Sequence, residues 1–221
     1  MAALMSASVK LRLLCGIMAF LFGASAVAGP QGEPSQPQAV RAAPTYHGGL
    51  VTPPLAKPKF VLTDTSGAPF DFWAETQGYV TLLFFGYTHC PDVCPLQLAN
   101  VASSLQRVPP EVRKHVKVVF VTTDPARDSA AVLRTWLDHF DPRFIGLTGS
   151  EPAIVAAQHA AQLPPASKTV LANRDYAMAH AAFALAYTKD NRAHVIYPEG
   201  VSPGDWSHDL PLLVKETWSS Q

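Results

Sequence analysis

Two nearly uninterrupted apolar runs, rich in β-branched and aromatic residues, dominate the hydrophobic pattern of the chain. They cover Val80–Phe85 and Val116–Thr122. Runs without polar alternation are typical of central parallel strands that are covered on both faces. Apolar residues recur at helical spacing after each run, from Leu98 to Val108 and from Val132 to Phe140. Strands that alternate with helices predict an α/β protein with a mixed central sheet.

Shorter segments extend this pattern at both ends of the chain. The pattern predicts an N-terminal hairpin, one more strand, an Ala-rich helix after Ser150, a second hairpin and a C-terminal helix. In chain order these elements are expected at Phe60–Thr63 with Pro69–Trp73, Phe144–Leu147, Glu151–Gln162, Ala182–Thr188 with Ala193–Tyr197, and Asp209–Trp218. Pro211 is expected in the first turn of the last helix, where its missing N–H is tolerated.

The first 28 residues differ from the rest of the chain. Lys10 and Arg12 precede an uncharged apolar stretch, Leu13–Ala28, which ends in A-S-A-V-A-G-P. This pattern predicts a secretory signal peptide cut before Gly29, with an uncleaved N-terminal membrane anchor as the alternative. The stretch from residue 13 to residue 28 is shorter than the roughly 20 residues of a membrane span, which favours the signal peptide.

Residues 29–58 are rich in proline, glycine and glutamine and predict an extended linker. The expected organisation is therefore a signal peptide or anchor (1–28), a linker (29–58) and one folded domain (59–221). Hydrophobic residues make up 48% of the chain and charged residues 15%, with a formal net charge of 0. This composition permits an ordinary core, and without a basic stripe it excludes a nucleic-acid partner.

Two cysteines directly after the first apolar run are the candidate chemistry. Cys90 and Cys94 lie four residues apart, beyond a turn at Gly86. If the loop coils by one helical turn, both sulfurs point to one side, above the carboxyl end of a central strand. Such a pair can hold a soft metal ion or close a disulfide reversibly. A purely structural disulfide across so short a loop would remove little entropy from the denatured chain.

The cysteine segment, F-F-G-Y-T-H-C-P-D-V-C-P (Phe84–Pro95), resembles the signature of the Sco/SenC family of thioredoxin-like copper chaperones. Three later segments resemble that family in the same order: V-V-F-V-T-T-D-P-A-R-D (Val118–Asp128), F-D-P-R-F-I-G-L-T-G (Phe140–Gly149) and D-Y-A-M-A-H (Asp175–His180). The resemblance spans Lys59–Val214. It implies a thioredoxin-like three-layer sandwich in which Cys90, Cys94 and His180 are the metal ligands.

The resemblance further implies an exported copper-binding metallochaperone. Its cargo would be Cu(I) or Cu(II), and its location the periplasm or the outer face of the inner membrane. Its partner would be the copper-accepting subunit of a haem–copper (cytochrome c) oxidase, at the dinuclear copper centre, with another copper chaperone or thiol–disulfide protein as a second partner. A thiol–disulfide oxidoreductase that uses Cys90 and Cys94, or a copper or redox sensor, stays open as an alternative.

Several residues near these motifs have two interpretations. His89 either lowers a thiol pKa in its charged form or is a polar loop residue, and Asp92 either rims the site or is a solvated turn residue. Asp124 either supports the ligands or stabilises its own turn. Ala179 and Ala181 stand where the family has Asp and a hydroxyl residue, which predicts the 10–100-fold lower affinity typical of lost outer-shell partners. The other histidines are expected to be surface or core residues: His47, His115, His139, His159, His194 and His208.

Overall fold

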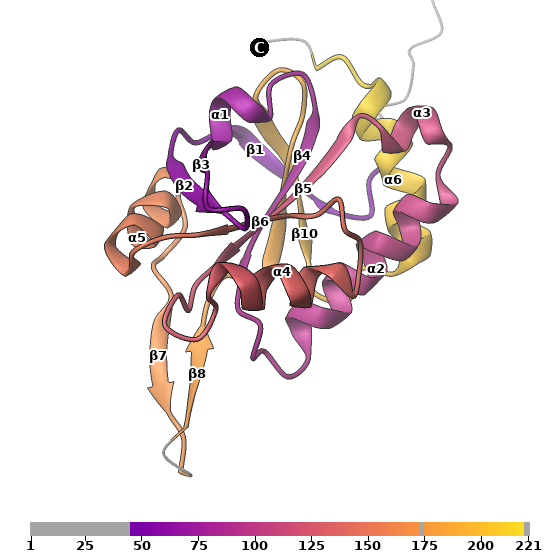
Figure 1. Cartoon of the computed structure of the whole chain (residues 1–221). Coiled ribbons are helices and arrows are strands. Elements are labelled where there is room, and N and C mark those ends of the chain that lie inside the picture. The colour runs from indigo at the N-terminus through magenta and orange to yellow at the C-terminus, as the bar shows by residue number, and fades with distance from the viewer. Residues whose placement is uncertain (1–44, 173–174, 219–221) are drawn as a thin grey trace, which may run out of the picture. The chain divides into compact units, whose positions relative to one another are not determined.

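A mixed sheet of eight strands runs through the centre of the protein, in the order β1-β10-β9-β4-β5-β6-β2-β3 (Figure 1). The computed structural model describes residues 45–172 and 175–218. The strands of this sheet are β1 Gly49–Ala56, β2 Val61–Asp64, β3 Pro69–Asp71, β4 Val80–Gly86, β5 Val116–Thr122, β6 Ile145–Thr148, β9 Phe183–Tyr187 and β10 Arg192–Pro198. β4 pairs in parallel with β5 and antiparallel with β9, and all its residues are buried, as the apolar run predicted.

Helices cover both faces of this sheet and complete the predicted three layers. They are α1 Phe72–Glu75, α2 Val93–Arg107, α3 Pro110–Arg113, α4 Ala130–Asp138, α5 Glu151–Ala160 and α6 Pro203–Lys215. Alternate residues of β4 pack against the helices on opposite faces of the sheet, because successive side chains of a strand point to opposite faces. Leu82 and Phe84 pack with α2, α3, α4 and α6. Leu83 and Phe85 pack with α1 and α5.

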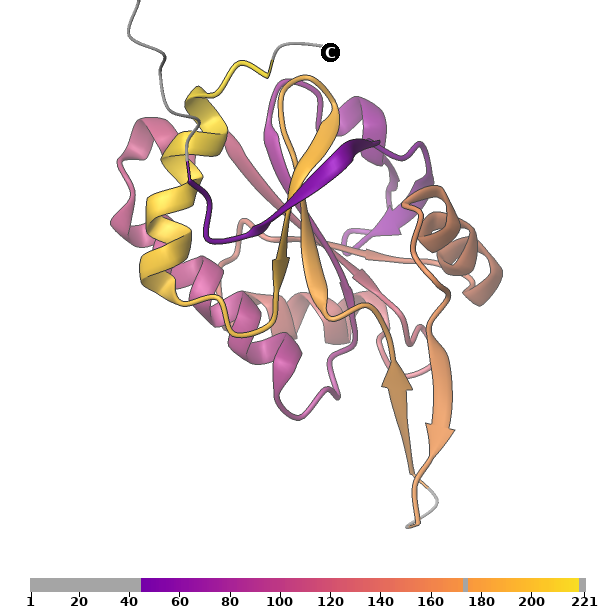
Figure 2. The ribbon, with the colours of Figure 1, turned by 180° about the vertical axis from the view of Figure 1, so that it is seen from behind.

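The segment before β2 corrects part of the linker prediction. Residues 49–56 lie within the expected linker, yet they form the edge strand β1, which pairs antiparallel with β10 (Figure 2). Proline is confined to edge strands and bulges, since it cannot donate a ladder hydrogen bond. Pro53 and Pro54 fit this rule, because the pairing register shifts between Leu50 and Leu55. The high proline content of residues 49–56 therefore led to the prediction of a linker where the structure has an edge strand.

The N-terminal predictions fall largely beyond this region. The expected signal peptide or anchor at residues 1–28 and the linker residues 29–44 lie outside the described residues. Within the two described ranges, no helix combines the length and the apolar character that crossing a bilayer requires.

The C-terminal helix begins six residues earlier than predicted, which is about one and two thirds turns at roughly 3.6 residues per turn. The sequence placed it at Asp209–Trp218, whereas α6 covers Pro203–Lys215. Ser202 and Asp205 form a capping box, with a proline at the first helical position between them. Pro211 consequently lies inside the helix and not in its first turn. The capping signal was the better indicator of the start.

A second sheet of two strands was not predicted. β7 (Ser167–Val170) and β8 (Tyr176–Ala179) pair antiparallel and project from the main body (Figures 1 and 2). Arg127 ties this hairpin to the rest of the protein, because its guanidinium lies 3.7 Å from the centre of the Tyr176 ring and pairs with Asp175 at 3.2 Å. β8 matters for the site, since the next residue in the chain is His180.

Candidate metal centre

Cys90 and Cys94 lie beyond the carboxyl end of β4, where the chain turns into α2. Cys94 is in the first turn of this helix and is fully buried, whereas Cys90 in the preceding loop is half-buried. Both thiols are free, and the backbone N–H of Cys94 points to the Cys90 sulfur at 3.5 Å. One helical turn therefore brings the two sulfurs to the same side, as the four-residue spacing predicted.

Gly86 allows the helix to approach the end of the strand. A Cβ atom at this position would lie 2.8 Å from the Cys94 sulfur and 2.9 Å from Cε2 of Phe120. Real Cβ contacts are almost never so short, and neither neighbour has room to move, since both are fully buried. The Cys94 sulfur is thus packed directly against the backbone of β4.

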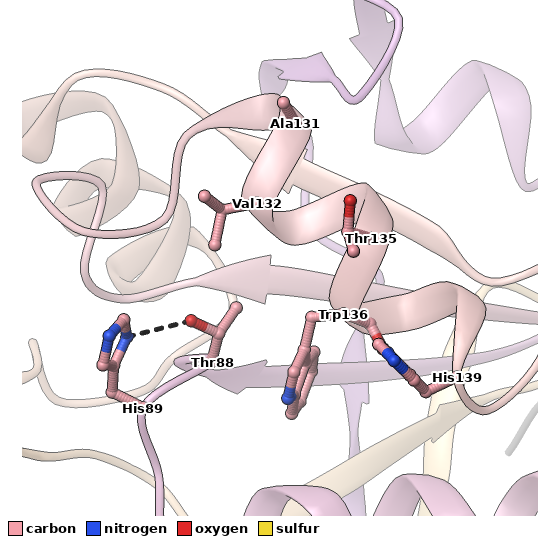
Figure 3. A pocket seen from close by; sticks show the side chains of 7 residues that line it. All are labelled: Thr88, His89, Ala131, Val132, Thr135, Trp136 and His139. Atoms are coloured by element: carbon pink, nitrogen blue, oxygen red, sulfur yellow. Dashed lines mark hydrogen bonds between the residues drawn. The ribbon is translucent and has the colours of Figure 1, made fainter.

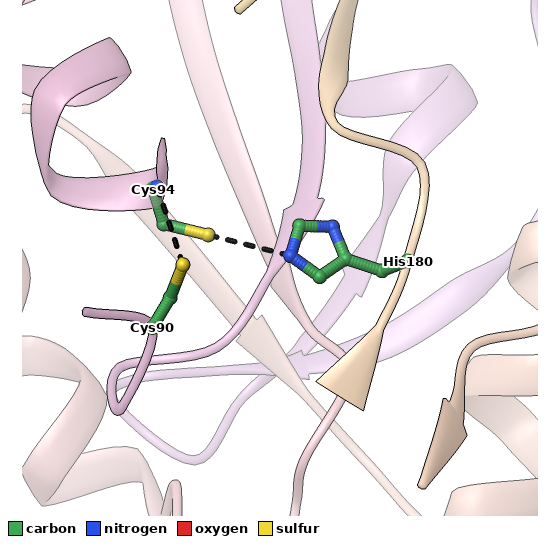
Figure 4. Close-up of side chains that lie close together, drawn as sticks. All are labelled: Cys90, Cys94 and His180. Carbon is green, nitrogen blue, oxygen red and sulfur yellow. Dashed lines mark hydrogen bonds between the residues drawn. The ribbon is translucent and has the colours of Figure 1, made fainter. Parts of the chain in front are cut away.

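Antiparallel pairing of β9 with β4 brings His180 to the same place. Ala184 of β9 lies opposite Phe84 near the end of β4, so the residues just before β9 lie beside the cysteine loop. The His180 Nε2 atom is 3.5 Å from the Cys94 sulfur (Figure 4). One donor atom each from Cys90, Cys94 and His180 lies within 4.8 Å of the others.

A backbone carbonyl sets the orientation of the His180 ring. Nδ1 lies 3.1 Å from the carbonyl oxygen of Ala181. A carbonyl can only accept, so Nδ1 carries the proton and Nε2 presents its lone pair to the sulfurs. The Tyr87 and Phe84 rings meet the imidazole edge-to-face, at centroid distances of 5.7 and 6.3 Å. Main chain and aromatic rings thus provide the support that Ala179 and Ala181 lack in their side chains.

The two thiols shift their pKa values in opposite directions. The hydrogen bond from the Cys94 thiol lowers the pKa of Cys90 to about 5, against the opposing effect of burial. Backbone N–H groups of Cys94 and Asp92 add to this lowering. The same hydrogen bond and burial raise the pKa of Cys94. Cys90 is therefore the more acidic thiol of the pair, and Cys94 the less acidic one.

The donor set fits a soft or borderline metal ion. Thiolates select Cu(I), Zn(II) and Fe–S clusters, and imidazole suits copper and zinc. Two sulfurs and one nitrogen also leave a coordination position for an incoming ligand.

Comparison with known proteins identifies the family of the chain. Residues 51–215 match the sequence model of the SCO1/SenC family. The chain belongs to the SCO1/SenC family. Copper-bound ScoI of Bradyrhizobium japonicum is 31% identical, with a TM-score of 0.64 over 72% of this chain and 99% of ScoI. Copper-bound yeast Sco1 is 26% identical, with a TM-score of 0.66 over 75% of this chain and 91% of Sco1. The thioredoxin-like fold and the family predicted from sequence are thereby confirmed.

Curated relatives of this SCO1/SenC protein are matched over only part of their length. A protein of Stutzerimonas stutzeri is 38% identical over 128 residues, which are 57% of this chain and 60% of the relative. An SCO2-like protein of Rickettsia felis is 41% identical over 43% of this chain and 45% of its own length. The chain therefore spans less than two thirds of either relative.

In this SCO1/SenC protein, a buried carboxylate anchors the loop before Cys90. Asp128 is fully buried and accepts hydrogen bonds from the Thr88 N–H (3.0 Å), the Thr88 hydroxyl (2.5 Å) and the Thr122 hydroxyl (2.6 Å). Asp128 thereby joins the end of β5 to the cysteine loop. No local pattern in the sequence indicates this contact, because it spans 40 positions of the chain.

The remaining candidates have ordinary roles. Asp124 pairs with Arg127 and accepts the Tyr176 hydroxyl at 2.9 Å, so it stabilises its turn and the β7–β8 hairpin. Asp92 is exposed at the start of α2 and makes no capping hydrogen bond with its side chain. His89 is half-exposed, and its Nδ1 lies 3.1 Å from the Thr88 hydroxyl. The contacts of Asp124 and His89 and the exposure of Asp92 favour the structural interpretation of these residues.

An apolar groove lies between this loop and α4 (Figure 3). Thr88 and His89 line one side, and Val132, Thr135 and Trp136 of α4 line the other. The groove therefore adjoins the loop that carries Cys90.

Proposed function

We propose that this SCO1/SenC protein binds one copper ion through Cys90, Cys94 and His180. The observation that carries the proposal is the convergence of one donor atom from each residue within 4.8 Å. The copper-bound relatives from B. japonicum and yeast support copper as the metal. Two thiolates and one imidazole suit Cu(I), and an added ligand would accommodate Cu(II).

The bound copper is cargo that is delivered to another protein. Sco proteins are described as cytochrome c oxidase assembly proteins, so we infer that the acceptor is the dinuclear copper centre of a haem–copper oxidase. Delivery takes place outside the cytoplasmic membrane, where the predicted signal peptide or anchor at residues 1–28 would direct the protein. The half-buried Cys90 and His180 are the ligands that an acceptor reaches first, and the buried Cys94 is released last. Ligand exchange between two soft sites carries this transfer, and no catalytic acid or base takes part.

Copper titration of the reduced protein tests the ligand assignment. The parent protein should bind one equivalent of copper with sulfur and nitrogen ligation in X-ray absorption spectra. His180→Ala should lower copper affinity by more than the 10–100-fold typical of a lost outer-shell partner. His159→Ala removes an exposed histidine of α5 and is the matched control, which should bind like the parent. Equal affinity of the His180→Ala variant and the parent would eliminate the assignment.

Copper transfer to a soluble oxidase copper domain tests the delivery step. The copper-loaded protein is mixed with the copper-free domain, and the absorption of the dinuclear centre is followed. Formation of that centre at the expense of the donor's copper is the expected result. Copper binding without any transfer would contradict the delivery role and favour the copper-sensor alternative.

Thiol–disulfide exchange is a second candidate function, favoured by the unequal exposure of two free thiols. The half-buried Cys90 thiolate attacks a partner disulfide, which forms a mixed disulfide and releases one partner thiolate. Cys94 then attacks the Cys90 sulfur, which releases the second partner thiol and closes the Cys90–Cys94 disulfide. Two electrons pass to the partner. His180→Ala should leave this exchange nearly intact, and loss of the exchange in that variant would contradict the separation of the two roles.

A further inference from the structure

A second cluster of candidate metal ligands lies between the start of β1 and α6. His47 precedes β1, while His208 and Asp209 belong to α6. One donor atom from each residue lies within 4.8 Å of the others. The two imidazoles meet edge-to-face, at a centroid distance of 4.7 Å. The cluster shares no residue with the centre formed by Cys90, Cys94 and His180.

The Asp209 carboxylate is held in a fixed orientation. It is fully buried, and its Oδ2 accepts hydrogen bonds from the N–H of His47 (2.8 Å), the N–H of Gly48 (3.3 Å) and the hydroxyl of Tyr197 (2.9 Å). Its Oδ1 faces Nδ1 of His47 at 3.0 Å and Nδ1 of His208 at 2.7 Å. Three donors thus orient the carboxylate, and its second oxygen points to two ring nitrogens. Hydrogen-bonded outer-shell partners orient metal-binding carboxylates in the same way.

Both rings are accessible from solvent. The side chains of His47 and His208 are 46% and 50% exposed, whereas Asp209 between them has no exposed surface. A cation can therefore reach the ring nitrogens without any movement of the core. The Nε2 atom of His47 lies 3.4 Å from an Asp205 carboxylate oxygen. The Asp205 carboxylate can accept a hydrogen bond from Nε2–H, and the tautomer with its proton on Nε2 has a free Nδ1 lone pair for a metal.

We propose that Nδ1 of His47, Nδ1 of His208 and Oδ1 of Asp209 form a second metal site for a divalent cation such as Zn(II) or Cu(II). Imidazole and carboxylate suit these borderline ions, whereas Cu(I) prefers thiolates. Bonds of about 2.0–2.1 Å in tetrahedral geometry separate ligand atoms by ~3.3 Å. The two present Nδ1–Oδ1 distances, 3.0 and 2.7 Å, need to open by only a few tenths of an ångström.

Without a cation, each Nδ1–H donates to the same carboxylate oxygen. Binding of the cation moves the proton of each neutral ring from Nδ1 to Nε2 and replaces both hydrogen bonds by metal–nitrogen bonds. The cation then fastens the chain before β1 to α6. Because Zn(II) would bind the folded state and not the unfolded state, it should raise the melting temperature, and the increase should grow with the free Zn(II) concentration relative to its Kd.

Zinc titration of a cysteine-free protein separates this site from the copper centre. The full chain with Cys15, Cys90 and Cys94 replaced by serine is titrated calorimetrically with ZnCl2. One equivalent should bind, with nitrogen and oxygen ligands at about 2.0–2.1 Å in X-ray absorption spectra. His47→Ala and His208→Ala should each weaken Zn(II) binding at least about tenfold, since each removes a ligand. Because this background lacks both copper-binding thiols, the result is independent of the proposed copper function.

His159→Ala in the same cysteine-free background is the matched control and should leave zinc affinity unchanged. Circular dichroism melting of each variant identifies any loss of folding. If His208→Ala disturbs α6, the zinc affinity of His47→Ala still tests the site, because His47 lies outside that helix. Absence of zinc binding in the cysteine-free protein would overturn the proposal. Equal affinities of the parent and both histidine variants, or an equal loss in His159→Ala, would overturn it as well.

Discussion

Replacing Gly86 by alanine would insert a methyl group between β4 and the first turn of α2. The new Cβ would lie 2.8 Å from the Cys94 sulfur and 2.9 Å from Cε2 of Phe120. Neither side chain has exposed surface, so both must shift within a filled core. Overpacking of this kind costs about 1–3 kcal/mol. The Gly86→Ala variant should therefore unfold at a lower urea concentration than the parent.

The same substitution should weaken copper binding if Cys94 is a ligand. Relief of the clash moves the Cys94 sulfur away from its position near His180 Nε2. Loss of a residue that only orients a metal ligand typically costs 10–100-fold in metal affinity. Because Gly86→Ala displaces a ligand itself, we expect copper affinity to fall at least about tenfold. Urea unfolding followed by circular dichroism and competitive copper titration measure the two effects on one preparation.

Gly49→Ala is the matched control for this experiment. The nearest heavy atom to a Cβ at Gly49 is Cγ1 of Ile196 at 3.5 Å, which is an ordinary contact. The free energy of unfolding of Gly49→Ala should stay within about 0.5 kcal/mol of that of the parent, and its copper affinity should be unchanged. A Gly86→Ala variant with the stability and copper affinity of this control would refute the close packing of Cys94 against β4.

Two further predictions concern regions outside the metal centre. Burial alone would raise the pKa of Asp141, but hydrogen bonds from Arg143 outweigh it and lower this pKa, so the carboxylate stabilises the fold above its unfolded pKa of about 4. The difference in unfolding free energy between the parent and Asp141→Asn should therefore be full at pH 7 and shrink as the pH falls below 4, measured by urea unfolding. Arg127→Ala removes the contacts with Asp175 and Tyr176, and should accelerate amide hydrogen exchange in β8 while that in β4 stays slow.

Each of these predictions has a control on the same protein. Asp138→Asn changes a half-exposed carboxylate in a helical pair with Arg134, and should alter stability by at most about 0.5 kcal/mol. A stability difference for Asp141→Asn that persists unchanged at pH 2 would contradict the linkage. Arg107→Ala, at the exposed end of α2, should leave hydrogen exchange in β8 unchanged. Equal protection of β8 in the parent and in Arg127→Ala would show that this arginine does not hold the hairpin.

Local signals in the chain were sufficient for most of the secondary structure. The apolar runs of β4 and β5 appear at their predicted positions, because strands that are covered on both faces are apolar at most positions. The four-residue spacing of Cys90 and Cys94 likewise predicted two sulfurs on one side, since one helical turn depends only on neighbouring residues. β1 was missed because its two prolines resemble a linker until β10 provides a pairing partner. The late start predicted for α6 came from treating Pro211 as a first-turn residue and overlooking the capping box at Ser202.

The sequence alone determined that this chain forms an α/β sandwich and that two thiols follow its central strand, because periodicity and helical spacing are properties of adjacent residues. The family resemblance indicated His180 as a ligand. The orientation of its ring depends on the Ala181 carbonyl, and its position depends on the antiparallel pairing of β9 with β4. Both contacts exist only after folding. The cluster of His47 and Asp209 joins residues 162 positions apart, and no local pattern indicates it. Only the tertiary structure brings such distant groups within bonding distance, because the register of the sheet and the packing of α6 set their separation.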